Sequence, residues 1–132
     1  MKAERFFDGQ RTAAPFLGEL VTRQAIFDCV VRHHRKQRRR CPAEGRCFYR
    51  FAGDMCFAGL LIDDTRYDPS MEGYYIRNLL RVFAMPAWFH DNIDFIEELQ
   101  IIHDTETNWP GGRMDMILGL FAAERGLTIP SA

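Results

Sequence analysis

Apolar side chains recur at helical intervals in the first third of the chain, and this spacing constrains the fold more than any other feature. The stripe comprises Leu17, Leu20, Val21, Ile26, Phe27, Val30 and Val31. Spacings of three and four residues place side chains on one face of an α-helix. Helix-forming residues continue until Pro42, and the residue before a proline avoids the helical conformation. The sequence therefore predicts one long helix from about Phe16 to about Arg39.

The chain is long enough to form one domain with a hydrophobic core. It has 132 residues, of which 47% are hydrophobic and eleven are phenylalanine. No apolar stretch approaches the ~20 residues that span a bilayer, and residues 1–14 lack the apolar region of a secretory signal. We expect a single globular α+β domain over residues 15–132, a flexible lead-in over residues 1–14, and a cytoplasmic protein without membrane contact.

Two segments rich in aromatic and branched side chains follow Pro42. Residues 46–51 read RCFYRF and residues 55–62 read MCFAGLLI, and both compositions are typical of β-strands. The intervening AGD suits a short hairpin turn that contains glycine. We expect these two strands to pair antiparallel and to pack against helices, because an isolated hairpin is only marginally stable in water.

The rest of the chain predicts three further helices. The first follows a loop with a turn at Asp68–Pro69, and Pro86 ends or interrupts it. Its apolar residues are Ile76, Leu79, Leu80 and Phe83. The second is expected to begin at Asp91, with Asp94 three residues later resembling a capping box. Its inner face is expected to hold Ile93, Ile96, Leu99, and Ile102 or His103.

The third of these helices is expected to open between Asn108 and Gly112. Its apolar side chains are Met114, Ile117, Leu118 and Phe121. Gly126 follows the last of them, and glycine is the residue that most often ends a helix in the left-handed conformation. The expected architecture is therefore one long N-terminal helix, a two-stranded hairpin and three helices.

A dense basic run lies near the end of the first helix. Its six cations are Arg32, Arg35, Lys36, Arg38, Arg39 and Arg40, and because the net charge is −1 the rest of the chain carries −7. Three interpretations stay open. The run is the solvated end of a helix whose dipole favours cations, a docking patch for an acidic protein, or a grip on nucleic acid. No helix-turn-helix, zinc-finger or RNP motif supports the third interpretation.

The four cysteines do not form a recognisable metal motif. They are Cys29, Cys41, Cys47 and Cys56, with no Cys-x-x-Cys pair. In a reducing compartment they would be free thiols. The last three with His33 or His34 could supply the four ligands of zinc, but buried small side chains are the more economical interpretation. Basic neighbours would favour a thiolate at Cys41, yet no catalytic motif surrounds it. We expect no metal, no cofactor and no catalytic residue.

An acidic loop and an aromatic segment are further candidates for partner contact. The loop carries Asp63, Asp64, Asp68 and Glu72. Its spacing matches neither an EF-hand nor a zincin helix, but it suits an acidic recognition surface, since loops often carry function. Trp88 follows Pro86 and is a candidate interface anchor, because tryptophan often dominates protein contacts.

The order of three segments resembles a known group of proteins. These segments are QAIFDCVVRHHRKQ, CFYRFAGDMCFAGLLIDDTRYDPSMEG and LQIIHD, followed by a closing helix that contains Trp109 and Gly-Leu pairs. Over about residues 24–127 the chain is similar to small phage- and prophage-encoded proteins with no assigned activity, from which it departs in its dense arginine run. The resemblance implies a small cytoplasmic protein of phage or mobile-element origin and implies no site residues.

These observations lead to three hypotheses. The first is a non-enzymatic interaction protein that inhibits a bacterial defence complex such as a CRISPR effector. Its contacts would come from Arg35, Arg38, Arg39 and Arg40, or from Asp63, Asp64, Asp68 and Glu72, with Trp88 as an anchor. The alternative is a small nucleic-acid-binding protein that uses the arginine run. A weaker alternative is a metal protein or enzyme built on the thiols and histidines.

Overall fold

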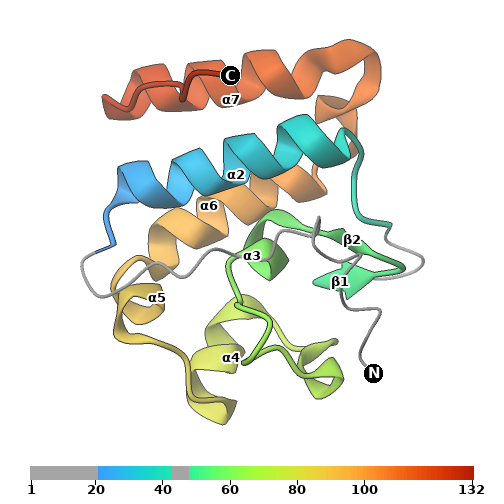
Figure 1. Ribbon diagram of the computed structural model, residues 1–132, viewed down its shortest axis with the longest axis vertical. Coiled ribbons are helices and arrows are strands. Elements are labelled where there is room, and N and C mark those ends of the chain that lie inside the picture. The colour runs from blue at the N-terminus through green and yellow to red at the C-terminus, as the bar shows by residue number, and fades with distance from the viewer. Residues whose placement is uncertain (1–20, 43–47) are drawn as a thin grey trace.

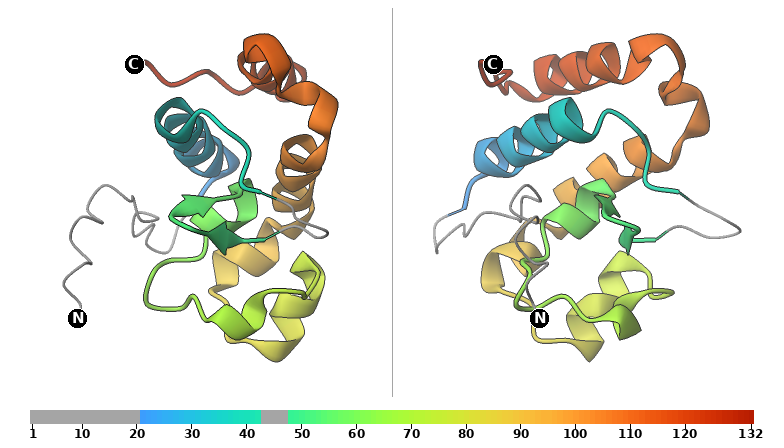
Figure 2. Two further views of the ribbon diagram at one scale, coloured as in Figure 1. Left: turned by 90° about the vertical axis from the view of Figure 1, so that its right-hand side faces the viewer. Right: turned by 45° about the vertical axis from the view of Figure 1, so that its right-hand side comes forward.

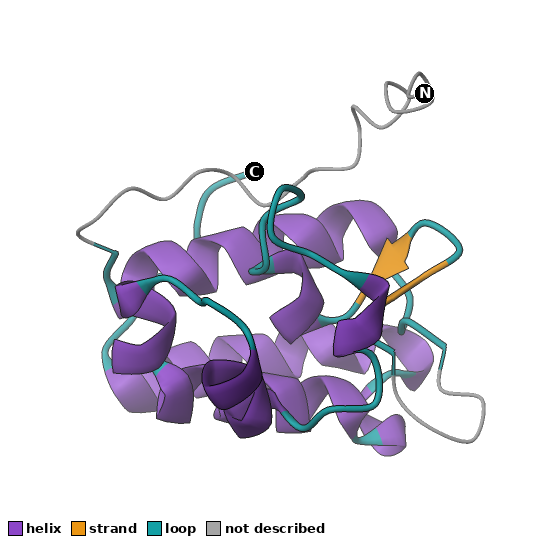
Figure 3. Cartoon of the chain, turned by 90° about the horizontal axis from the view of Figure 1, so that it is seen from below, coloured by secondary structure: helices purple, strands orange, loops and turns teal. Residues whose placement is uncertain are grey.

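The computed structural model describes residues 21–42 and 48–132. Most of these residues are helical, with one small antiparallel hairpin (Figure 3). The helices and strands are α2 (Arg23–Gln37), β1 (Arg50–Phe51), β2 (Asp54–Met55), α3 (Phe57–Leu60), α4 (Ile76–Val82), α5 (Ala87–Asp91), α6 (Ile93–Asp104) and α7 (Arg113–Arg125). Single 3₁₀ turns are Pro69–Met71, Glu106–Asn108 and Pro110–Gly112. In the described part of the chain, no helix has the length and apolarity that crossing a bilayer demands.

The long helix α2 is confirmed in type but is shorter than predicted. The predicted residues 16–20 lie outside the described residues, and Val21 and Thr22 are not helical. Thr22 is the N-cap, because its Oγ1 accepts a hydrogen bond from the N–H of Ala25 (3.0 Å). The helix ends at Gln37 rather than near Arg39 because Arg38 adopts the left-handed conformation (φ 58°) and its N–H donates to the carbonyl of His34.

The predicted hairpin is confirmed, with much shorter strands. Arg50 pairs with Met55 and Phe51 pairs with Asp54. The turn between them consists of Ala52 (φ 51°) and Gly53 (φ 91°). Positive φ at both central residues is the backbone of a tight turn that matches the twist of paired strands. Of the predicted first strand, residues 46 and 47 lie outside the described residues.

The prediction of a second strand through residue 62 is wrong, because residues 57–60 form helix α3. Cys56 begins this helix by accepting a hydrogen bond at Sγ from the N–H of Gly59 (3.2 Å). The N–H of Ala58 donates to Oε1 of Gln100 on α6 (2.8 Å). A Cβ at position 59 would collide with the carbonyl oxygen of Tyr49, so only glycine permits this approach. Long-range contacts thus override the strand composition.

The predicted helix with Ile96 and Leu99 on its inner face forms as α6, but its predicted start at Asp91 is wrong. Asp91 is the last residue of α5, a short helix that begins after Pro86. Asn92 separates α5 from α6, and both its N–H (3.1 Å) and its side-chain amide (2.8 Å) donate to the carbonyl of Trp88. The carbonyl therefore holds a bend where the sequence suggested a helix start, and five helices rather than three follow the hairpin in the described chain.

The C-terminal helix α7 forms as predicted. It begins after Gly112 and ends where Gly126 takes the left-handed conformation (φ 70°). In space it lies at one end of the molecule, against both α2 and α6 (Figures 1 and 2). Ring contacts fix this arrangement. The centroid of Phe121 lies 6.0 Å from that of Phe27 on α2 and 5.6 Å from that of Phe95 on α6.

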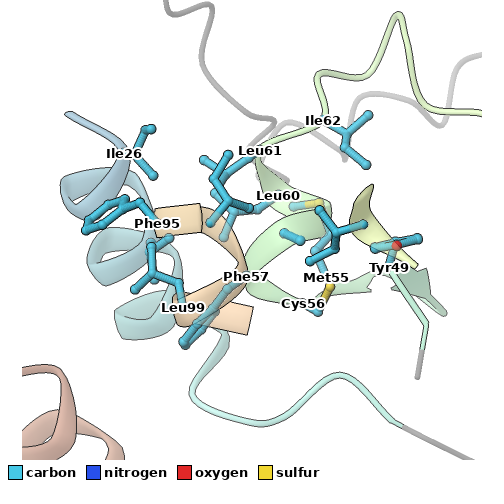
Figure 4. Close-up of a cluster of buried hydrophobic side chains, with 14 of the residues drawn as sticks. Ile26, Tyr49, Met55, Cys56, Phe57, Leu60, Leu61, Ile62, Phe95 and Leu99 are labelled. Atoms are coloured by element: carbon cyan, nitrogen blue, oxygen red, sulfur yellow. The ribbon is translucent and has the colours of Figure 1, made fainter. Parts of the chain in front are cut away.

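One hydrophobic core joins all of these helices. Helix α3 lies at its centre, between α2 and α6 and beside the hairpin (Figure 4). Fully buried side chains include Ile26 from α2, Phe57 from α3, and Leu99 from α6. Burial of each such side chain contributes about 1.5–3 kcal/mol. This core fixes which helical faces are left for solvent.

Candidate interaction surface

Each of the four predicted contact arginines pairs with another residue of the chain, and none of the four is buried. Arg39 makes a bidentate pair with Asp54, from Nε to Oδ2 (2.8 Å) and from Nη2 to Oδ1 (2.8 Å). The pair raises the pKa of Arg39 and ties the segment after α2 to β2. Arg40 donates to the carbonyl of Asp104 (3.3 Å) and lies 3.9 Å from the carboxylate of Glu106. These two arginines therefore hold the segment after α2 against the hairpin and the end of α6.

The other two predicted arginines line a groove between α2 and α7. Arg35 donates to the carbonyls of Pro130 (2.8 Å) and Ser131 (3.1 Å), and Arg38 lies 3.7 Å from the carboxylate of Asp115. The groove has a volume of about 310 Å³. The structure thus brings Arg35 and Arg38 together and directs Arg39 and Arg40 elsewhere. Their predicted role in partner binding stays a prediction.

Two cations of the run lie on α2 with their side chains exposed to solvent. Arg32 and Lys36 are exposed, and in the ranges 21–42 and 48–132 neither side chain makes a hydrogen bond or ion pair. They are four residues apart, so they lie on one face of the helix. Arg38 and Arg39 are exposed as well, with 54% and 68% of their side chains accessible, so four cations of the run reach the surface and two of these also pair with carboxylates of the chain.

The acidic loop is likewise built into the fold. The carboxylate of Glu72 accepts hydrogen bonds from the N–H groups of Tyr49 (2.8 Å) and Arg50 (3.1 Å). It also accepts from the hydroxyl of Tyr67 (2.6 Å), and burial followed by this bond raises the pKa of that hydroxyl. Arg50 packs over the ring of Tyr67 (4.5 Å to the centroid) and pairs with Asp64 (2.8 Å). Glu72 therefore stabilises the start of β1 rather than facing solvent freely.

The remaining predicted contacts have local roles. Asp68 accepts from the N–H and hydroxyl of Ser70 (both 2.8 Å), which lowers the pKa of its carboxyl. Asp63 accepts from the hydroxyl of Thr65 (2.8 Å) and the N–H of Arg66 (2.9 Å). Trp88 is half-buried, with its ring 5.8 Å from that of Phe89. The role of these residues in partner binding also stays a prediction.

Three histidines of α2 and α6 make hydrogen bonds within the chain. His103 is buried, accepts from the N–H of Cys41 (3.3 Å) at Nε2 and donates to Asp104 (3.0 Å) at Nδ1. His34 contacts Asp115 (2.9 Å) and His33 contacts the carbonyl of Met55 (3.0 Å). Burial lowers the pKa of all three imidazoles. They are therefore neutral near pH 7 and act as internal hydrogen-bonding groups.

The three thiols that the structure describes are buried or half-buried. Cys41 and Cys56 are buried, and burial raises the pKa of the Cys56 thiol well above its usual range. Cys29 is half-buried, and burial raises its pKa as well. Cys47 lies outside the described residues. Among the residues that the structure describes, no three histidine, cysteine or carboxylate side chains gather as a metal site.

The surface that sequence reasoning missed lies on α6 and α7. Three large apolar side chains project into solvent there. They are Ile101 (65% exposed), Met116 (56%) and Leu120 (56%). Ile101 and Leu120 adjoin a shallow groove of about 350 Å³ between the two helices. The other lining residues are Glu98, Ile102, Ile117, Phe121, Glu124 and Arg125. We call this surface, with Met116 one turn from Leu120, the α6–α7 outer face.

Helix α7 differs from an ordinary surface helix because it is apolar on two sides. Its inner side buries Met114, Leu118, Phe121 and Ala122. Met116, Ile117 and Leu120 lie on the other side, where the first and last of them are exposed. A helix that is hydrophobic on all sides is normally buried on all sides. This distribution was readable in the sequence, since Met116 and Leu120 fall outside the stripe that the predicted core uses.

Comparisons with protein families, with curated proteins and with solved structures found no match to this chain.

Proposed function

We propose that this chain is a non-enzymatic interaction protein that binds another protein through the α6–α7 outer face. The observation that carries the proposal is the exposure of Ile101 and Leu120 at one apolar groove, with the exposed Met116 one turn from Leu120. Contiguous exposed apolar surface with a charged border is typical of protein interaction sites. The border here is Glu98, Glu124 and Arg125, with the guanidinium of Arg125 3.2 Å from Glu98 and 3.3 Å from Glu124.

The internal chemistry supports a binding protein rather than an enzyme. A general acid or base must reach substrate with a suitable pKa, whereas His103 is buried and bonded on both ring nitrogens. The carboxylate of Glu72 accepts hydrogen bonds from two backbone N–H groups. Arg39 and Arg40 connect elements of the fold. The polar groups that suggested chemistry in the sequence thus have structural partners.

The partner class that we propose is a bacterial defence complex, such as a CRISPR effector, which this protein inhibits. This setting follows from the resemblance to small phage and prophage proteins that the sequence segments suggested, since such a protein would act by occupying host machinery. The proposed contact differs from the sequence-based hypothesis, because apolar side chains replace the arginine run and the acidic loop as the main contact. Buried apolar anchors carry most of the binding energy in protein interfaces.

Nucleic-acid binding is the alternative that the arginine run suggested. Its support is weaker, because Arg35, Arg38, Arg39 and Arg40 each contact an acceptor within the chain. Only Arg32 and Lys36 of that run have no such contact to a described residue. Titration of DNA and RNA at about 50 and about 200 mM salt tests this alternative, and tight binding with a steep loss at the higher salt would favour it.

A phage-plating assay tests the proposal directly. Bacteria with an active CRISPR effector would produce the wild-type chain, the Leu120→Glu variant or the Val82→Glu variant before infection by a targeted phage. Val82 is a matched control, because it is 53% exposed but lies on α4. We expect the wild type and Val82→Glu to restore plaques and Leu120→Glu to lose this effect, because a buried charge disrupts an apolar contact. Equal plaque counts with Leu120→Glu and wild type would contradict the proposed face.

A further inference from the structure

We propose that the α6–α7 outer face binds a second copy of this chain, with the α7 helices of the two copies antiparallel about a two-fold axis. This inference goes beyond the proposed function, since it gives the same surface a second partner. A two-fold contact uses the same patch on both copies, so each residue that faces another is faced by it in return. The surface must therefore be complementary to itself.

The outward stripe of α7 meets this requirement. Its residues are Arg113, Met116, Ile117, Leu120 and Glu124, at spacings that keep them on one face. An axis that crosses α7 midway between Leu118 and Gly119 places residue 113 opposite residue 124, and residue 117 opposite residue 120. Arg113 of one copy then faces Glu124 of the other, twice. Ile117 and Leu120 face each other across the centre, flanked by Met116.

The two charged residues are available for such a pair. Arg113 is exposed, and its guanidinium donates to the carbonyl of Thr107 (3.0 Å), which leaves further N–H groups free to donate. The carboxylate of Glu124 is 74% exposed and contacts Arg125 at 3.3 Å. The ends of the stripe lie about 16 Å apart, at 1.5 Å per residue. Each charge can therefore approach its counterpart without breaking a buried contact.

Helix α6 widens the contact beyond a single pair of helices. Ile101 is 65% exposed and lies on the groove that α6 and α7 share. With the α7 helices packed at the usual interaxial distance of about 8–10 Å, Ile101 of each copy would lie beside the α7 helix of the other. The face then resembles a four-helix arrangement in which two helices come from each copy.

The charge pattern favours a second copy over a helix of uniform charge. A basic amphipathic helix would meet Arg113 at one end of the stripe, and an acidic helix would meet Glu124 at the other end. Like charges that face each other are unfavourable. A stripe with a cation at its N-terminal end, an anion at its C-terminal end and an apolar centre is matched by its own antiparallel copy.

Sedimentation equilibrium of the full chain over micromolar to submillimolar concentrations tests the pairing. We expect the wild type to be a concentration-dependent dimer and Leu120→Glu to be a monomer throughout. Val82→Glu, with its matched exposed position on α4, should dimerise as the wild type does. A wild type that stays monomeric over this range would overturn the inference. Equal dimerisation of Leu120→Glu and wild type would overturn it as well.

A charge exchange tests the antiparallel register. Arg113→Glu alone and Glu124→Arg alone should each weaken dimerisation by about 10-fold, because each places like charges together. The double variant should restore it, and an equimolar mixture of the two single variants should form a heterodimer tighter than either homodimer. Single variants that dimerise like the wild type would overturn the register, since a non-specific apolar contact would not respond to both charges.

These outcomes are separable from those of the proposed function. If sedimentation shows a monomer while Leu120→Glu still loses plaque restoration, the face binds another protein and the self-pairing is wrong. If the wild type dimerises as expected but restores no plaques, the self-pairing stands and the proposed inhibition of the effector is wrong.

Discussion

Helices α2 and α7 have similar lengths and pack against the same core, yet the solvent-facing side of α2 is charged whereas that of α7 is partly apolar. Helix α2 has one apolar side, and its outer side carries charges, many of which contact other parts of the chain. Helix α7 is apolar on its inner side and partly apolar on its outer side. The comparison teaches that a conspicuous run of charge can be structural, whereas a few exposed apolar residues can mark the contact surface.

Substitutions on the inner side of α7 should lower the free energy of unfolding far more than substitutions on its outer side. Phe121 is 5% exposed and contacts Phe27 and Phe95. Replacement by alanine should lower the free energy of unfolding by about 3–5 kcal/mol, because it leaves a cavity. Leu120→Ala, one residue away, should change it by less than about 0.5 kcal/mol. Urea denaturation at a concentration where the chain is monomeric measures both values. Similar losses for both variants would contradict the assignment of an inner and an outer side.

Lowering the pH should lower the free energy of unfolding through three histidines of α2 and α6. Burial lowers the pKa values of His33, His34 and His103 below that of an unfolded histidine near 6.5. Below that pH the unfolded chain binds more protons, so stability is fully present above about pH 6.5 and falls as the pH drops below it. Asp115 beside His34 and Asp104 beside His103 oppose the shift, while Arg38 and Arg40 add to it.

The measurement is the melting temperature between pH 7.5 and pH 5. We expect it to fall by several degrees for the wild type and by less for His103→Gln, because glutamine can accept the bond from the N–H of Cys41 without titrating in this range. His90→Gln serves as the control, since His90 is exposed. A pH dependence that is the same for His103→Gln and for the wild type would show that His103 does not contribute.

Among the arginines of residues 32–40, those that pair with carboxylates should contribute to the melting temperature, and Arg32 should not. Arg39→Gln removes a bidentate pair with Asp54 of β2, whose two carboxylate oxygens each lose the hydrogen bond from Arg39. Thermal unfolding should show a loss of a few degrees, because breaking a pair with a mostly buried partner costs more than losing an exposed charge. Arg32→Gln should leave the melting temperature unchanged. Equal melting temperatures for the two variants would mean that Arg39 is as free as Arg32.

Local patterns predicted much of the helical framework. The stripe in α2, the glycine that ends α7 and the two-residue turn of the hairpin each depend on neighbours in sequence. Helix α3 was missed because its conformation depends on distant groups. Gln100 on α6 holds the N–H of Ala58, and Tyr49 leaves room only for glycine at position 59. Propensity cannot detect such contacts.

The candidate surface was predictable in part. The density of positive charge made the arginines of the basic run candidate contacts. A sequence does not reveal that these arginines lie beside distant acceptors, namely Asp54, Asp104, Asp115 and the carbonyl of Pro130. Met116 and Leu120 carried a usable signal, since they lie opposite the buried side of α7. Their exposure became evident only when the packing of α7 on α2 and α6 was known.

Site-specific photo-crosslinking in bacteria tests the central claim, that contact is made by α7 rather than by α2. A photoreactive amino acid would replace either Leu120 or Lys36, both of which are exposed in the folded chain. We expect a strong covalent adduct from position 120, with a second copy of the chain or with the defence effector, and none above background from position 36. An adduct from position 36 together with none from position 120 would contradict it.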